Sequence, residues 1–353
     1  MAEKTSTVVR KEAHLDLCAG ADVEPQGNDT LLGQAHLIHC ALPELALSDV
    51  DLSVTLFGKR LHYPLLVTGM TGGTARAGSI NRDLASLAQE FGLAFGVGSQ
   101  RAMSEDASRT DTFRVREVAP TAVLLGNIGM AEAARVGCDG VRRLADGIDA
   151  DGLAVHLNVA QELGQVEGDR DFRGGYALIE SLAAAFADRL VVKETGCGLS
   201  PQVARRLVDC GVKALDVSGL GGTSWIRVEQ LRSAPEAASL AQSFDGWGIP
   251  TAAAVASVHR AIGDDAMLIA SGGIRSGVEI AKCLALGASM AGMALPLFRA
   301  QQQGGLPLAR QTLEGVLAGL RQAALLTGAR DVAALRANRV VVTGALASWL
   351  EVL

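Results

Sequence analysis

The sequence predicts a single (β/α)8 barrel with an N-terminal extension and an insertion after the sixth strand. The chain has 353 residues, and such a barrel needs about 250, which leaves room for both additions. From residue 64 onward, short apolar runs alternate with longer Ala- and Leu-rich stretches of helical spacing. Apolar strands that are each followed by a helix indicate a parallel sheet covered by helices. An open doubly wound sheet is the alternative, and the eight apolar runs favour a closed barrel.

The eight expected strands and the helices between them follow the chain in order. The strands are expected at residues 65–68, 93–97, 122–127, 153–158, 190–193, 214–217, 267–270 and 290–293. Helices are expected, among others, at residues 80–91, 131–145, 176–187, 201–210 and 278–286. We therefore divide the chain into an N-terminal extension (1–63), the barrel (64–305) and a largely helical C-terminal region (306–353) that completes the barrel domain. The insertion covers residues 219–250.

Composition excludes several classes of protein. The net charge is −6 with no basic block, so the sequence lacks the cationic footprint of a nucleic-acid-binding protein. No apolar run reaches the roughly 18 residues of a membrane span, and the charged N-terminus does not resemble a signal peptide. Six cysteines without CxxC spacing indicate reduced thiols in a cytoplasmic protein, with neither disulfides nor zinc.

Active-site residues of such barrels lie at the carboxyl ends of the strands. The most specific of these ends is Gly272-Gly273 after the seventh strand, because glycines let backbone amides approach a phosphate. The loops after strands seven and eight commonly bind phosphate in this fold. A simple tight turn is the alternative, and the small residues at the end of strand eight, before Ala294 and Leu295, favour the phosphate site.

Lys193 ends the fifth strand, where a buried ammonium is costly unless it meets a ligand or a carboxylate. A reduced flavin carries negative charge near its N1 atom, which an adjacent ammonium stabilises. A salt bridge with Glu194 is the alternative, but neighbouring residues of a strand point to opposite faces. Four polar residues at other strand ends provide hydrogen bonds for a flavin ring and ribityl chain: Ser99, Asn127, Ser218 and Thr223.

The fourth strand ends in a segment that combines an imidazole, amides and a carboxylate, from His156 to Glu162. Glu162 is a candidate ligand of Mg²⁺, because this cation prefers carboxylate oxygen and shares it with substrate phosphate. A satisfied buried histidine is the alternative interpretation of His156. The run at 167–171, taken alone, indicates a solvated charged loop.

These motifs together resemble the type 2 isopentenyl-diphosphate isomerases, which are FMN-dependent, and the resemblance covers nearly the whole chain. The N-terminal Arg10-Lys11 and the His-x-Asn-x-x-Gln-Glu element are its most specific parts. One departure is Val159, where the family often has proline. The other matching segments are His14 and residues 70–73, 98–100, 167–172, 193–194, 221–225 and 271–275.

The resemblance implies an enzyme that interconverts isopentenyl and dimethylallyl diphosphate, with reduced FMN itself as the acid–base catalyst, supported by His156, Gln161 and Glu162. It implies Mg²⁺ on Glu162, NADPH as the reductant that primes the flavin, and a homo-oligomer (tetramer or octamer). The implied substrate contacts are Arg10, Lys11, Ser99, Gln100, Arg101, His156, Asn158 and Gln161. The implied FMN contacts are Met70, Thr71, Gly72, Ser99, Asn127, Lys193, Ser218, Thr223, Gly272, Gly273, Ile274, Arg275, Ala294 and Leu295.

Two other functions are weighed against this one. An FMN-dependent 2-hydroxy-acid oxidoreductase shares the barrel and the phosphate site, but it needs a histidine base near the end of strand six. Residues 216–223 contain no histidine. A non-catalytic flavin-binding protein is the second alternative, and it would not require Arg10, Lys11, His156 and Glu162 together.

Overall fold

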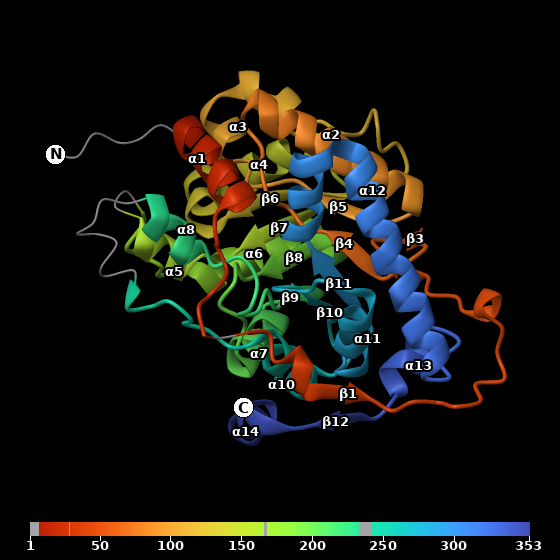
Figure 1. The fold of residues 1–353 in the computed structure, drawn as a ribbon. Coiled ribbons are helices and arrows are strands. Elements are labelled where there is room, and N and C mark those ends of the chain that lie inside the picture. The colour runs from red at the N-terminus through yellow and green to blue at the C-terminus, as the bar shows by residue number, and fades with distance from the viewer. Residues whose placement is uncertain (1–6, 28, 166–167, 233–241) are drawn as a thin grey trace.

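The computed structural model describes residues 7–27, 29–165, 168–232 and 242–353. Its centre is a closed barrel of eight parallel strands, in which each strand pairs with the next and the last pairs with the first (Figure 1). The prediction of a (β/α)8 barrel is confirmed, and every predicted strand overlaps an observed one. The strands are β4 (Leu65–Val67), β5 (Ala94–Gly96), β6 (Val123–Gly129), β7 (Gly152–His156), β8 (Leu190–Lys193), β9 (Ala214–Asp216), β10 (Met267–Ala270) and β11 (Met290–Met293).

Helices cover the outside of the barrel, and sequence signals at their first residues explain where several begin. The Thr74 side chain accepts a hydrogen bond from the backbone of α2, and Ser276 forms a capping box with Glu279 at α11. The five predicted helices are all present. The outer helices are α2 (Ala75–Phe91), α4 (Met130–Asp146), α6 (Gly175–Phe186), α7 (Pro201–Asp209), α10 (Thr251–Ile262), α11 (Gly277–Ala285) and α12 (Leu295–Leu326).

Apolar side chains fill the interior of the barrel at the end opposite to the carboxyl ends of the strands, so the site lies at the carboxyl ends. A hairpin of β2 (Val54–Leu56) and β3 (Lys59–Leu61) inserts Leu56 and Leu61 among the inward-facing residues of the strands. These include Leu66, Val191 and Met290. A second, larger cluster fills the space between strands and helices. In the described part of the chain, the barrel is therefore open to a ligand at the carboxyl ends of its strands.

The N-terminal extension and the C-terminal region meet in a small antiparallel sheet, β1 (Ala35–Leu37) with β12 (Val340–Val342). The C-terminal region contains the end of α12, α13 (Val332–Ala337) and α14 (Gly344–Val352). The expected boundary at residue 305 falls on a kink within α12, where Gly304 and Gly305 leave the helical conformation. The described residues also form 3-10 turns at η1 (Leu32–Gln34), η2 (Leu47–Asp49), η3 (Ala107–Thr112) and η4 (Ala187–Arg189).

Among the described residues, four further helices surround the open end of the barrel: α1 (Thr7–Gly20), α3 (Arg101–Glu105), α5 (Val159–Gly164) and α8 (Trp225–Arg232). α1 packs against α3, α8 and α12, and so brings the N-terminal extension to the carboxyl ends of the strands (Figure 1). The predicted insertion after the sixth strand contributes α8, and its residues 233–241 lie outside the described residues. Within the described chain, no helix combines the length and the apolarity required to span a membrane.

Candidate functional site

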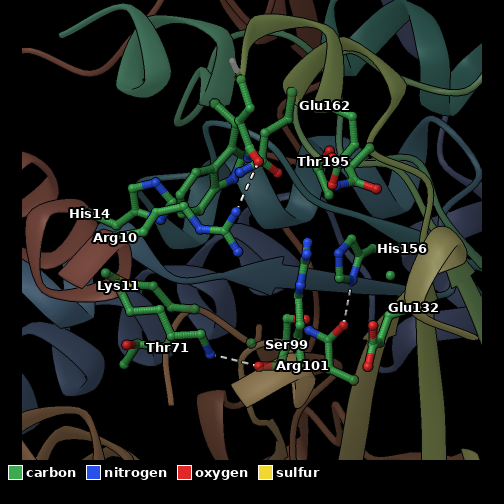
Figure 2. Close-up of a pocket in the computed structure, with 18 of the residues that line it drawn as sticks. Arg10, Lys11, His14, Thr71, Ser99, Arg101, Glu132, His156, Glu162 and Thr195 are labelled. Carbon is green, nitrogen blue, oxygen red and sulfur yellow. Dashed lines mark hydrogen bonds between the residues drawn. The ribbon is translucent and has the colours of Figure 1, made fainter. Parts of the chain in front are cut away.

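Two adjoining cavities lie at the carboxyl ends of the barrel strands. We call the first, under α1, the cationic cavity, because Arg10, Lys11 and Arg101 line it (Figure 2). Lys193 is a fourth cation in its wall. We call the second the glycine cavity, because Gly222, Gly272, Gly273 and Gly292 line it. The two cavities share part of their walls, so they form one continuous site. The shared residues are Cys18, Gly69, Met70, Lys193, Thr195 and Trp225.

The glycine cavity depends on a close approach of two loops. A side chain on Gly222 would place its Cβ 2.5 Å from the Gly273 nitrogen, and Gly273 itself has a φ of 79°. Only glycine adopts this conformation without strain and allows the two backbones to meet. Arg275 lines the same cavity and donates to Glu24 of the N-terminal extension at 2.5 Å. A backbone-lined pocket beside an arginine suits a phosphate group.

His156 lies in the wall of the cationic cavity as a neutral imidazole. Burial, together with the positive charges of Lys193 and Lys11, lowers the pKa of His156 to about 3. Its Nδ1 lies 2.8 Å from Oδ1 of Asn127, whose own amide nitrogen donates to the Val97 carbonyl. An amide oxygen only accepts, so Nδ1 carries the proton and Nε2 is an acceptor. His156 can therefore donate to a phosphate oxygen only after it takes up a proton.

One face of α1 forms the roof of the cationic cavity. Lys11, His14, Leu15 and Cys18 all line it, and their spacing of three and four residues places them on one side of a helix. Lys11 Nζ donates to the Ser99 carbonyl at 2.7 Å (Figure 2). Desolvation in the cavity, followed by the nearby charge of Arg10, lowers the pKa of Lys11 to about 7. An anionic ligand would restore its charge, so this roof is suited to a diphosphate.

Glu229 of α8 is a buried carboxylate that connects α1 to α5. Its Oε1 accepts from His14 at 3.0 Å, from Gln161 at 3.2 Å and from Gln165 at 2.9 Å. Its Oε2 accepts from Arg232 at 2.9 Å. Burial opposes ionisation, but the hydrogen bond and charge of His14, with Arg232, outweigh it and lower the pKa of Glu229 to about 2. A permanent negative charge thus holds the roof of the cavity to its wall.

Glu162 of α5 lies in the wall of the cationic cavity and is buried. Its Oε1 accepts from the Asn158 amide at 2.8 Å, and its Oε2 accepts from the Asp169 backbone at 2.9 Å. The described residues contain no group of three or more metal-ligating side chains. Mg²⁺ commonly uses one or two carboxylates together with water and substrate phosphate, and a single glutamate fits that pattern.

Most of the predicted site residues line these cavities. The exceptions are Gln100 and Gly72. The cationic cavity contains Arg10, Lys11, Met70, Thr71, Ser99, Arg101, Asn127, His156, Asn158, Gln161, Glu162 and Lys193. The glycine cavity contains Met70, Lys193, Ser218, Thr223, Gly272, Gly273, Ile274, Arg275, Ala294 and Leu295. Glu167 of the charged run lies outside the described residues.

Gln100 and Gly72 lie behind the wall instead of in it. The Gln100 side chain is fully buried, donates to the Leu144 carbonyl at 2.8 Å and accepts from the Asn127 backbone at 3.0 Å. These hydrogen bonds support the end of β6. The structure therefore shows Gln100 in contact with the protein interior and not with the substrate cavity that we predicted for it. Gly72 packs against the ring of Phe113, where a Cβ would clash.

Sequence reasoning missed several residues that line the cationic cavity or hold it together. Gln165 lies one helical turn after Gln161, and Leu15 and Cys18 continue the Lys11 face of α1, so spacing could have indicated all three. Glu132 and Thr195 also line the cavity, each a few residues beyond a strand end. Glu229 had no local signal, because its partner His14 is 215 residues away in the chain.

Comparisons with known proteins agree with this architecture. The family model described as FMN-dependent dehydrogenase matches residues 157–342. A structure of mandelate oxidase with 3,3-difluoro-2-hydroxy-3-phenylpropionic acid has a TM-score of 0.65, with 18% identity over 96% of this chain and 99% of the oxidase. The TM-score shows a shared fold, and at this low identity the likeness extends to the fold alone. The fold and the paired cavities therefore define a (β/α)8 barrel of the FMN-dependent dehydrogenase class.

Relatives with higher sequence identity carry the name of one particular enzyme. The chain is 45% identical to the isopentenyl-diphosphate delta-isomerase of Stutzerimonas stutzeri, over 96% of this chain and 98% of the relative. It is 39% identical to the enzyme of the same name from Pyrococcus furiosus, over 99% of this chain and 91% of that relative. The chain belongs to the isopentenyl-diphosphate delta-isomerase family.

Proposed function

We propose that this protein is a type 2 isopentenyl-diphosphate delta-isomerase, which interconverts isopentenyl and dimethylallyl diphosphate with reduced FMN, Mg²⁺ and NADPH. The observation that carries the proposal is the shared wall of the two cavities. A cationic cavity suited to a diphosphate opens directly onto a glycine cavity suited to a flavin phosphate, with Lys193 in both. A substrate anchored by its diphosphate would then have its carbon chain beside the flavin.

The residues of the glycine cavity fit FMN. Backbone amides near Gly222, Gly272 and Gly273, with Arg275, would hold its phosphate. Ser218 and Asn127 would form hydrogen bonds with the ribityl chain and the ring of FMN. Lys193 would lie near the edge of the ring that becomes anionic on reduction. When bound and reduced, the flavin supplies an electron-rich face and a proton at N5 for the addition and removal of protons on the alkene.

The cationic cavity would bind the substrate and exclude water. Arg10, Lys11 and Arg101 would neutralise the diphosphate, with hydrogen bonds from Ser99, Asn158 and Gln161. His156 would join them as a donor once the diphosphate draws a proton onto Nε2. The apolar part of the shared wall, formed by Cys18, Met70 and Trp225 with Leu15 beside it, would enclose the five-carbon unit.

Glu162 would bind Mg²⁺ together with water and the diphosphate. We expect Glu162→Gln to lose most of its Mg²⁺-dependent turnover while it retains FMN. Isothermal titration with Mg²⁺ in the presence of inorganic diphosphate checks the metal site separately from turnover. Unchanged turnover and unchanged Mg²⁺ affinity in this variant would move the metal to another residue.

Localisation and assembly belong to the same proposal. We propose a cytoplasmic homo-oligomer, a tetramer or octamer, that binds neither nucleic acid nor membrane. The absence of a basic block in the sequence and of an apolar spanning helix among the described residues supports the last part of this proposal, that the protein binds neither nucleic acid nor membrane. Light scattering at several protein concentrations measures the assembly.

The likeness of the fold to a mandelate oxidase favours a second candidate, a 2-hydroxy-acid oxidoreductase. That reaction needs a base near the end of β9, and residues 216–223 contain no histidine. Anaerobic mixing with 2-hydroxy acids discriminates the two functions, because an oxidoreductase flavin bleaches on reduction. We expect the flavin to stay oxidised with hydroxy acids. With NADPH and Mg²⁺, we expect isopentenyl diphosphate to be converted into an acid-labile allylic product.

A further inference from the structure

A buried carboxylate, Asp216, lies in the barrel beside Lys193 but lines neither cavity. Asp216 and Lys193 are register partners on the neighbouring strands β9 and β8. Ala214 and Val191, two residues earlier on each strand, belong to the cluster that fills the barrel. Since strand residues two apart share a face, Asp216 and Lys193 both point to the inside of the barrel.

The two oxygens of Asp216 have different surroundings. Oδ1 accepts from the Ser218 backbone at 3.1 Å and from the Ser271 hydroxyl at 2.6 Å. Oδ2 is buried and has no hydrogen-bond partner in the described part of the chain. A buried carboxylate oxygen without a partner is costly, so a compensating charge is expected close by.

Lys193 supplies that charge. Burial raises the pKa of Asp216, and the positive charge of Lys193 and the hydrogen bonds from Ser271 and Ser218 oppose this rise. Lys193 Nζ itself donates to the Glu194 carbonyl at 2.9 Å, which leaves protons of the ammonium for the cavity. Asp216 also fixes Ser218, a cavity residue whose φ of 39° is unusual for a residue with a side chain.

We propose that Asp216 is a positioning residue that balances the charge of Lys193 and thereby lowers the reduction potential of the bound flavin. This inference rests on the proposed FMN function. An uncompensated ammonium would stabilise the reduced flavin as an anion. A carboxylate on the adjacent strand weakens that stabilisation and favours the neutral reduced flavin over its anion.

The test compares Asp216→Asn with Ser271→Ala in the full-length protein loaded with FMN. Both variants lose an interaction at the same carboxylate, but only Asp216→Asn removes its charge. We expect Asp216→Asn to bind reduced FMN at least about tenfold more tightly relative to oxidised FMN, a rise of about 30 mV for a two-electron couple. Ser271→Ala should change this ratio by about threefold or less. Anaerobic titration against a redox dye gives the potentials, and fluorescence quenching gives the FMN affinities.

A second pair of variants covers the case in which an unpaired lysine prevents folding of Asp216→Asn. Lys193→Gln is compared with the Lys193→Gln/Asp216→Asn double variant, and the double variant should have the higher potential. Equal potentials within both pairs, in proteins that fold and bind FMN, overturn the charge-balancing role. A wild-type protein that takes up no FMN instead overturns the proposed function, so the two failures are distinguishable.

Discussion

Replacement of Glu229 by glutamine should release α1 from the cationic cavity. The carboxylate accepts hydrogen bonds at both oxygens, from His14, Gln161 and Gln165 on one side and from Arg232 on the other. Glutamine has one acceptor, so its amide nitrogen would face a donor. Glu229→Gln therefore loses the negative charge and sets at least one donor against another in a buried place.

The pKa of Glu229 gives the magnitude. A fall from the ordinary value of 4.5 to about 2 corresponds to about 3 kcal/mol of stabilisation of the ionised form. This contribution is present above the ordinary pKa and is lost as the pH falls toward 2. If all of it orders α1, the KM for isopentenyl diphosphate should rise by up to about a hundredfold at neutral pH, since Arg10 and Lys11 are on this helix.

Steady-state kinetics with FMN held at saturation measures the effect, and limited proteolysis measures the release of α1. Arg232→Gln is the matched control, because it removes a partner of Glu229 but leaves the three donors that join α1 and α5. We expect a much smaller rise of KM in this control and wild-type FMN affinity in both variants. A Glu229→Gln protein with wild-type KM and wild-type protease resistance would refute the reasoning.

Three other predictions concern single residues. Because the pKa of Lys11 is about 7, the KM for the diphosphate should rise as the pH increases above 7, and Lys11→Arg should flatten this dependence in a pH series of KM. In Gly273→Ala, a Cβ would lie 2.3 Å from the Gly221 carbonyl, so FMN affinity should fall at least about tenfold, or about 1.4 kcal/mol. Gly263→Ala, also at positive φ but in open space, should retain FMN, and equal FMN affinities in the two variants would contradict the packing argument. Burial raises the pKa of Glu194 to about 7, above its unfolded value, so the fold loses stability as the pH rises from about 4.5 to 7. Glu194→Gln should accordingly have a higher Tm than the wild type at pH 8 but not at pH 5. A Tm difference between the two proteins that does not depend on pH would contradict this explanation.

The fold could be predicted because its signal is local. Each barrel strand is a short run of buried apolar residues, and each is separated from the next by a helix. Several of these helices begin at a capping residue, such as Ser276 before α11. The strand ends then followed from topology, because all parallel strands end on one side of the barrel. Lys193, Asn127 and the glycines after β10 could be placed at the site for this reason.

The rest depends on contacts that the sequence does not indicate. Gln100 follows a strand end just as Ser99 does, but it turns into the wall, where its partner Leu144 is 44 residues away. The importance of Glu229 depends on α1 folding across the barrel to place His14 beside it. A long-range hydrogen bond of this kind has no periodicity or motif, so only the structure reveals it.

The measurement that tests the central claim most directly is the ratio of allylic product formed to NADPH consumed. Purified protein with FMN and Mg²⁺ is reduced anaerobically with a limiting amount of NADPH, and isopentenyl diphosphate is then added. If the reaction is an isomerisation, acid-labile allylic diphosphate should accumulate to many equivalents for each NADPH oxidised. A product yield of one equivalent or less for each NADPH, or no allylic product from protein that holds FMN, would contradict the proposed function.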